Sequence, residues 1–292
     1  MSISSELTAL NGYILGAYNG VTAKGGTAPQ NKNMAGLATA IDSIPAGGGV
    51  GIPRGVDAQG VFGNPTQNFT FSLPSTARDL GTYSLYDAFY NCSTLIAVDM
   101  STITTASGQN AAYWAFYNCG NLASIDMRSL TTVSGTSAMQ SICQGCRNLT
   151  SVNLSSLKSV TSLQGMSNAF SSCRSLASID LSSLTTLSGS SCMSGAFAYA
   201  TVTSVTFTSL TTLTGSKALN TAFSNCGSLQ SLYFPALTSS SFGSYTNQFD
   251  TMLRYTSGVT VHFPSSIQST IGSWASVTSA FGSTNGSVLF DL

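Results

Sequence analysis

A 27-residue repeat constrains the fold of this chain more than any other feature of its sequence. Cysteine stands at Cys92, Cys119, Cys146 and Cys173, and each follows the one before it by 27 positions. Apolar residues recur with the same spacing, as in Phe89, Leu95, Val98 and Met100; Phe116, Leu122, Ile125 and Met127; Cys143, Leu149, Val152 and Leu154; and Phe170, Leu176, Ile179 and Leu181. A period of this length is the signature of stacked repeats, in which each unit buries its apolar edge against its neighbour. The sequence therefore predicts a solenoid.

Two periodicities alternate within each repeat. Apolar residues leading up to the cysteine have the i, i+3, i+4, i+7 spacing of a helical stripe, as at Met139, Ile142, Cys143 and Cys146. Glycine recurs just before this stripe, where a turn must be made, at Gly108, Gly135, Gly189 and Gly215. After the cysteine, Ile125 and Met127 alternate with polar residues, which is typical of a strand. We therefore expect an α/β repeat solenoid with a parallel sheet and one short helix in each 27-residue repeat.

The patterning divides the chain into three parts. In residues 1–46, apolar residues step by three and four positions in two short runs. This predicts two helices that form either a hairpin or the seam of a homo-oligomer through residues 7–44. Residues 47–60 are rich in glycine and predict a linker. Residues 61–292 form the predicted solenoid. Within it we expect an N-terminal capping repeat, regular repeats and a C-terminal cap, over residues 61–87, 88–248 and 249–292.

Charged residues are scarce. They make up 7% of the chain, against a typical figure of about 25%, and the formal net charge is zero. No basic patch is available to neutralise phosphates, so we expect no nucleic-acid partner. No apolar run is long enough to span a bilayer, so we expect no membrane insertion. The first basic residue is Lys24, and the N-terminus therefore lacks the pattern of a classical signal peptide.

The seven cysteines are an odd number, and five of them hold one repeat position. This register favours reduced, buried side chains over a disulfide framework, and Ala200 stands at the same position in another repeat. The pair Cys143 and Cys146 has the close spacing of metal ligands, but both residues fall on core positions. We therefore predict no metal and no cofactor.

The sequence carries no motif of a catalytic site. It has no phosphate-binding glycine loop and no paired-histidine zinc motif. His262 is the only histidine and lies in the last apolar strand. We expect no enzyme and name no catalytic residue. A hydrolase built around His262 stays open as an alternative, because a Ser-His-Asp triad needs one histidine.

One polar column is the candidate binding site. It consists of the outward residues between the last two apolar positions of successive strands, Asp99, Asp126, Asn153 and Asp180, with Arg128 beside it and Tyr233 where it ends. Two interpretations are open. The column is either a solvated face, whose carboxylates bond nearby hydroxyls, or a ligand face for a glycan or a protein. Calcium is a weaker alternative, because regular strands rarely bring enough oxygens to one point.

The pattern A-F-x-x-C-x-x-L-x-x-I-D-L-x-x-L, from Ala169 to Leu184, resembles the BspA-like leucine-rich repeats of bacterial surface proteins. The resemblance extends from about Val61 to Pro264, although the repeats of that family are usually a few residues shorter. It implies a leucine-rich-repeat superhelix with the parallel sheet on its concave face, so that the polar column would face the concave groove. A surface-exposed, extracellular binding protein is the function it implies.

The first 45 or so residues, with the stretch LTALNGYILGAYNGVTAKGG, are similar to short N-terminal modules of bacteriophage and prophage tail proteins. This similarity implies a virion-associated location and explains how a chain without a signal peptide could reach an exposed surface. It favours a tail-associated receptor-binding protein. A structural spacer and a bacterial surface protein are the alternatives.

Overall fold

The computed structural model describes residues 68–73, 75–272 and 286–292. The predicted helical module of residues 1–46 and the linker of residues 47–60 lie outside the described residues.

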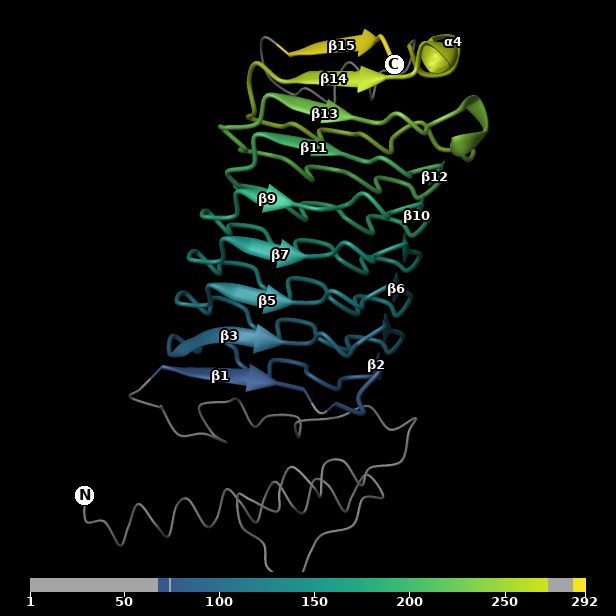
Figure 1. Ribbon diagram of the computed structural model, residues 1–292. Helices are drawn as coiled ribbons and strands as arrows, with labels where there is room; N and C mark the ends of the chain where they lie inside the picture. The colour runs from purple at the N-terminus through teal and green to yellow at the C-terminus, as the bar shows by residue number, and fades with distance from the viewer. Residues whose placement is uncertain (1–67, 74, 273–285) are drawn as a thin grey trace, which may run out of the picture.

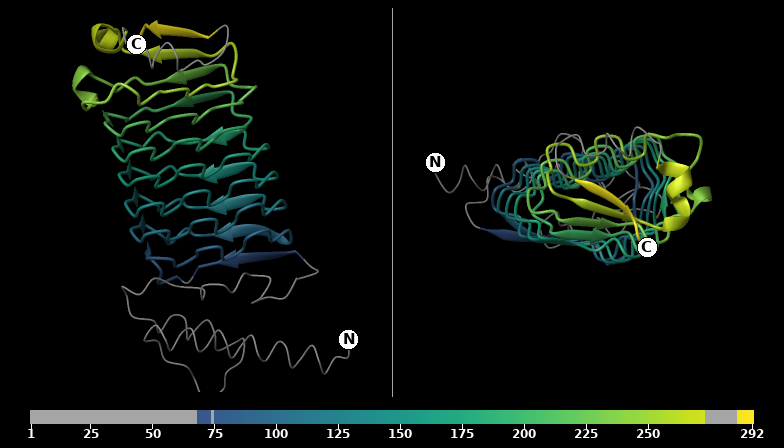
Figure 2. Two further views of the ribbon diagram at one scale, coloured as in Figure 1. Left: turned by 180° about the vertical axis from the view of Figure 1, so that it is seen from behind. Right: turned by 90° about the horizontal axis from the view of Figure 1, so that it is seen from above.

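The described chain winds into a parallel β-solenoid, in which each repeat forms one coil (Figures 1 and 2). The first sheet has the order β1 (Phe69–Ser72), β3 (Leu95–Asp99), β5 (Ser124–Asp126), β7 (Ser151–Asn153) and β9 (Ser178–Ile179). A second sheet continues this side with β11 (Ser204–Thr206), β13 (Ser231–Tyr233), β14 (Thr260–Phe263) and β15 (Ser287–Phe290). We call the outer surface of these two sheets the front face.

A narrower sheet lies further along each coil. Its strands are β2 (Asp79–Leu80), β4 (Thr105–Ala106), β6 (Thr132–Val133), β8 (Ser159–Val160), β10 (Thr186–Leu187) and β12 (Thr212–Leu213). Every strand pair in the three sheets is parallel. The predicted parallel solenoid is therefore confirmed.

The register of the strands follows the repeat. Ile125 pairs with Val152, which pairs with Ile179, and each partner is 27 residues further along the chain. The period lengthens before β14, where Tyr233 pairs with His262, 29 residues later. The extra residues fall in the segment that holds the 3-10 helix η1 (Ser239–Ser241).

The predicted helix in each repeat is wrong. A ribbon of consecutive turns stands in its place, at residues 82–91, 109–118, 136–145, 163–172, 190–199, 216–225 and 248–255. Seen along the solenoid, the ribbon forms the long side of each coil opposite the front face (Figure 2). We call the outer surface of these ribbons the turn face.

The hydrogen bonds of the ribbon explain why it is not helical. The Gln140 N–H donates to the carbonyl of Ser137 (3.2 Å) and closes a turn, whereas the Ser141 N–H donates to Ser167 in the next coil (2.8 Å). An α-helix would direct every N–H to the residue four positions before it and leave none for the next coil. Every fourth ribbon residue also has a positive φ, as at Ser137, Ser141 and Gly145. This conformation interrupts a helix, and glycine, asparagine and aspartate, which tolerate it best, hold several of these positions.

Helices are few in the described residues. Besides η1, there are η2 (Ser265–Ile267) and α4 (Gln268–Ile271), both near the C-terminal end. No helix in the described residues is long and apolar enough to cross a membrane.

The core consists of side-chain columns that run along the solenoid. Phenylalanine rings stack from coil to coil, as in Phe170 and Phe197, whose centroids lie 5.8 Å apart with an interplanar angle of 7°. All seven cysteines are free and buried. The prediction of reduced core cysteines is confirmed.

Candidate functional site

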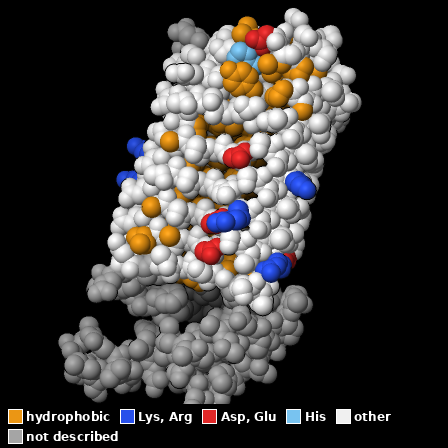
Figure 3. Space-filling view, in the orientation of Figure 1, with side chains coloured by type: hydrophobic (Ala, Val, Ile, Leu, Met, Phe, Trp, Pro, Cys, Tyr) orange, Lys and Arg blue, Asp and Glu red, His pale blue; other side chains and the backbone are white. Residues whose placement is uncertain are grey.

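The front face brings the predicted polar column together. Asp99 pairs with Asp126, and Asp126 pairs with Asn153. Asp180 continues the line, because Ile179 just before it pairs with Val152. Neighbouring strands lie about 4.8 Å apart, so four acidic or amide side chains stand in one row. Acidic side chains are visible along the middle of this face (Figure 3).

Each side chain of the column also closes a local turn. Its Oδ1 accepts a hydrogen bond from the backbone N–H two residues further on: Ser101 to Asp99 at 2.8 Å, Arg128 to Asp126 at 3.1 Å, Ser155 to Asn153 at 3.2 Å and Ser182 to Asp180 at 2.9 Å. This is an Asx turn, which ends the strand and fixes the side chain. The column therefore has a structural role that leaves Oδ2 of Asp99 and of Asp180 without a hydrogen bond in the described residues.

Arg128 neutralises one member of the column. Its guanidinium forms an ion pair with Asp126, with Nε 2.8 Å from Oδ2 and Nη2 also bonded to Oδ2. The hydrogen bond from Arg128 lowers the pKa of the Asp126 carboxyl. Asp99 and Asp180 have no such partner in the described chain, so the negative charge of the column lies on either side of Asp126.

The column continues into an aromatic end that the repeat pattern only partly indicated. Thr206 pairs with Tyr233, and Tyr233 pairs with His262. The imidazole stacks on the Tyr233 ring, with centroids 4.4 Å apart and an interplanar angle of 12°. His262 Nδ1 lies 2.9 Å from Asp291 Oδ1. Sequence reasoning missed this grouping because the 29-residue spacing takes His262 out of the 27-residue register.

Sequence reasoning also missed an aromatic cluster on the turn face. It consists of Tyr83, Tyr86, Tyr90, Tyr113, Trp114 and Tyr117, all half-buried. Tyr86 stacks on Tyr113 with centroids 5.5 Å apart, and Tyr90 stacks on Tyr117 at 4.9 Å. The signal in the sequence was the 27-residue spacing within each of these pairs.

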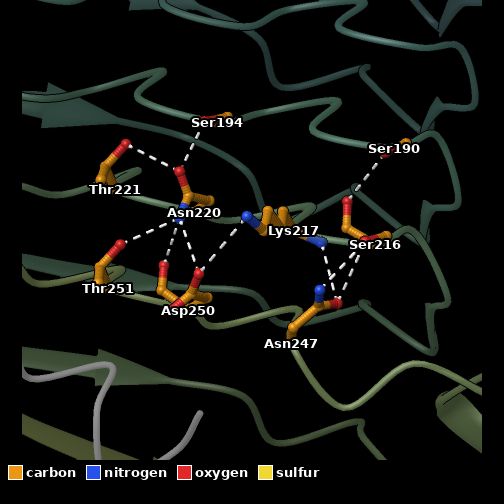
Figure 4. A network of polar contacts seen from close by, with 9 residues as sticks. All are labelled: Ser190, Ser194, Ser216, Lys217, Asn220, Thr221, Asn247, Asp250 and Thr251. Atoms are coloured by element: carbon orange, nitrogen blue, oxygen red, sulfur yellow. Dashed lines mark hydrogen bonds and ion pairs between the residues drawn. The ribbon is translucent and has the colours of Figure 1, made fainter.

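At the other end of the turn face, a polar network joins the last coils (Figure 4). The Asn220 amide donates to the carbonyl of Asp250 (2.9 Å) and to Thr251 Oγ1 (3.0 Å), and its Oδ1 accepts from Ser194 Oγ (3.2 Å). Lys217 Nζ lies 4.0 Å from Asp250 Oδ2. Since these groups bond one another across three coils, we interpret the network as a coil-to-coil connection.

Within the described residues, no group of three or more histidine, cysteine, aspartate or glutamate side chains is placed to hold a metal ion. Burial raises the pKa of the Cys143 thiol well above its usual value, which keeps this thiol protonated in the core.

Comparison with known families gives one match. The family model described as "BspA type Leucine rich repeat region" matches in six copies, over residues 58–193, 86–230 and 191–275. A comparison with curated proteins gave no match.

Proposed function

Because this chain belongs to the BspA-type leucine-rich repeat family, we propose that it is a non-enzymatic binding protein whose front face contacts a protein or glycan receptor on a cell surface. The observation that carries this proposal is the single row of polar and aromatic side chains on that face. The row runs from Asp99 through Asp180 to Tyr233 and His262, one residue per coil.

The chemistry of the row supports a polar ligand. Exposed serine side chains, Ser124, Ser151 and Ser178, form a second column on the same face, two positions before the acidic column. Hydroxyl groups can donate or accept hydrogen bonds, and carboxylates accept them. The Asx turns fix the acidic side chains before a ligand arrives, which lowers the ordering cost of binding.

The test must separate binding from the turn-closing role. Asn153 closes the same turn as its neighbours, so Asp99→Asn and Asp180→Asn keep the turn acceptor and remove the charge. Tyr233→Thr introduces the residue that Thr206 provides at the same position one coil earlier. Binding of the full chain to whole bacterial cells and to a glycan array would be compared for the wild type and this triple variant.

We expect the triple variant to fold normally and to lose most of its cell binding. The matched control is Lys158→Thr just before β8 of the narrow sheet, because Thr131 and Thr185 hold the equivalent positions in the neighbouring coils. Equal binding by the triple variant and the wild type would reject the front face as the receptor site.

A narrower version of the proposal is a phage or prophage tail-associated receptor-binding protein. It rests on the similarity of the first 45 or so residues to tail-protein modules, which lie outside the described residues. Proteomics of purified virions from an induced host would support it if the chain is present. Detection only on the bacterial surface would favour a bacterial surface protein.

The second candidate function is a structural or assembly component. The apolar stepping of residues 7–44 favours it, because such a pattern can pair helices between chains. Light scattering on the full chain would test it. A trimer or dimer that dissociates in the Leu10→Lys, Ile14→Lys variant supports it, and a monomeric wild type counts against it.

A further inference from the structure

We propose that the turn face of the first two described coils carries a separate carbohydrate-binding site, formed by the aromatic cluster and the carboxylate of Asp87. The site lies on the opposite side of the coil from the front face, and its action does not require the front face to bind anything.

The rings of the cluster form one continuous surface. Tyr90 and Tyr117 are nearly parallel, with an interplanar angle of 5°, and Trp114 lies across them at 60° and 61°, within 6.0 Å of both. Trp114 also contacts Tyr113 at 4.5 Å, which joins the two stacked tyrosine pairs. Each ring combines apolar area with a phenol or indole hydrogen-bonding group at its edge.

Trp114 occupies a ribbon position that the fold holds in the left-handed region in every described coil. Its φ is +55°, in the left-handed region. The equivalent residues of the other coils, Asp87, Ser141, Asn168, Gly195, Thr221 and Thr251, have the same conformation, and Trp114 is the one aromatic residue among them. The ribbon therefore requires the conformation at this position, and it does not require the large indole ring.

Asp87 supplies an acceptor that the fold does not use. Its Oδ1 is buried and has no hydrogen-bond partner, and the carboxylate forms no ion pair among the described residues. Burial raises the pKa of Asp87. The Asp87 N–H donates to the backbone carbonyl of Tyr113 at 3.0 Å, which places the two residues side by side on neighbouring coils. Buried acceptors are normally satisfied, and a ligand hydroxyl that displaces the side chains covering Oδ1 would satisfy this one.

A neutral sugar fits this combination of groups. Its C–H faces are apolar, and its hydroxyls need donors and acceptors close to an aromatic surface. The Asn118 amide, which donates to Asn91 Oδ1 at 2.9 Å, adds amide groups from the same two ribbons. Recognition of an organic cation typically uses a cage of several ring faces. Here the tyrosine rings stack on one another along the solenoid.

The cluster is confined to two coils. In the next ribbon the positions of Tyr113, Trp114 and Tyr117 hold Gln140, Ser141 and Gln144. Each coil advances about 4.8 Å, so the aromatic surface has the extent of a short oligosaccharide segment.

The neighbouring coil provides the substitutions for a test. Tyr113→Gln, Trp114→Ser and Tyr117→Gln introduce the residues that the third ribbon already accommodates, and thermal unfolding would verify folding. Tyr255→Asn is the matched control, because Tyr255 is an exposed tyrosine with φ +61°, and Asn225 has the same conformation one coil earlier. The full chain would be screened on a glycan array. Calorimetry would follow with maltohexaose, cellohexaose, chitohexaose and tetramethylammonium chloride.

We expect at least one neutral oligosaccharide to bind the wild type and the Tyr255→Asn protein equally, and to bind the triple variant about tenfold more weakly or worse. Asp87→Asn should weaken the same binding. The front-face substitutions Asp99→Asn and Asp180→Asn should leave oligosaccharide binding unchanged, so the experiment tests the two proposed sites independently. No glycan binding, equal binding by the triple variant, or a preference for tetramethylammonium would overturn the proposal.

Discussion

The thiol of Cys146 donates a hydrogen bond to the backbone carbonyl of Phe116, one coil earlier, with a sulfur–oxygen distance of 3.0 Å. The same bond recurs from Cys119 to Phe89 (2.9 Å) and from Cys226 to Phe197 (3.2 Å). The recurring cysteine is therefore both a small core residue and a donor that ties successive coils together.

This bond predicts the effect of removing one thiol. Cys146→Ala should lower the free energy of unfolding by about 1–2 kcal/mol, from the lost hydrogen bond and the lost packing volume. The fold should survive, because Ala200 already holds the same position in another coil. Urea unfolding would measure the change. Leu176→Ala serves as the reference, because it empties a larger volume of the core and should lower the free energy of unfolding by about 2–5 kcal/mol. A smaller loss of stability in Leu176→Ala than in Cys146→Ala would contradict this prediction.

The buried thiols also predict a loss of stability at alkaline pH. Burial raises the pKa of Cys192 and of Cys226 to about 12, whereas an unfolded cysteine titrates near about 8.5. Above that lower pKa the unfolded chain gains stability by losing thiol protons that the folded chain keeps. The stabilisation is thus complete below about pH 8.5 and is lost as the pH rises toward 12.

Thermal unfolding in reducing buffer between neutral and alkaline pH would measure this loss. A Cys192→Ala, Cys226→Ala variant should be less stable than the wild type at neutral pH and should lose less stability on going to alkaline pH. Parallel pH profiles for the two proteins would show that other groups cause the alkaline loss.

Gly135 predicts the effect of close contact between coils. A Cβ atom there would lie 2.1 Å from the carbonyl oxygen of Gly108, whereas a Cβ at Gly120 would meet nothing within 4 Å. Gly135→Ala should therefore lower the free energy of unfolding by about 1–3 kcal/mol. Gly120→Ala should be neutral or slightly stabilising, since it reduces the freedom of the unfolded chain. Equal unfolding midpoints for the two variants would contradict this packing.

The ion pair on the front face predicts a change in titration. The hydrogen bond from Arg128 holds the pKa of Asp126 below its ordinary value. This pair stabilises the fold above the unfolded pKa of about 3.9, and the effect is lost as the pH falls through the folded pKa. In Arg128→Ala the pKa of Asp126 should rise, as measured by NMR of its carboxyl carbon. The change in stability should be small, because both side chains reach solvent.

Sequence reasoning predicted the register of the fold well. The 27-residue spacing identified which residues of successive coils pair, so the spacing alone was enough to identify the row of Asp99, Asp126, Asn153 and Asp180. It also predicted the core position of the cysteines. Both results depend on patterns that repeat along the chain, because identical spacing in sequence becomes adjacency in a stacked fold.

The sequence by itself determined that this chain is a stack of parallel coils. It also determined which columns of side chains are buried and which point outward. Only the tertiary structure decided what lies between the strands. The stripe at Met139, Ile142 and Cys143 is buried as a helical stripe would be, yet half of the N–H groups in its ribbon bond the next coil instead of closing a helix. The structure also joined Tyr233 to His262 and brought Asp87 beside the aromatic rings. These contacts depend on how neighbouring coils meet, and no single repeat contains that information.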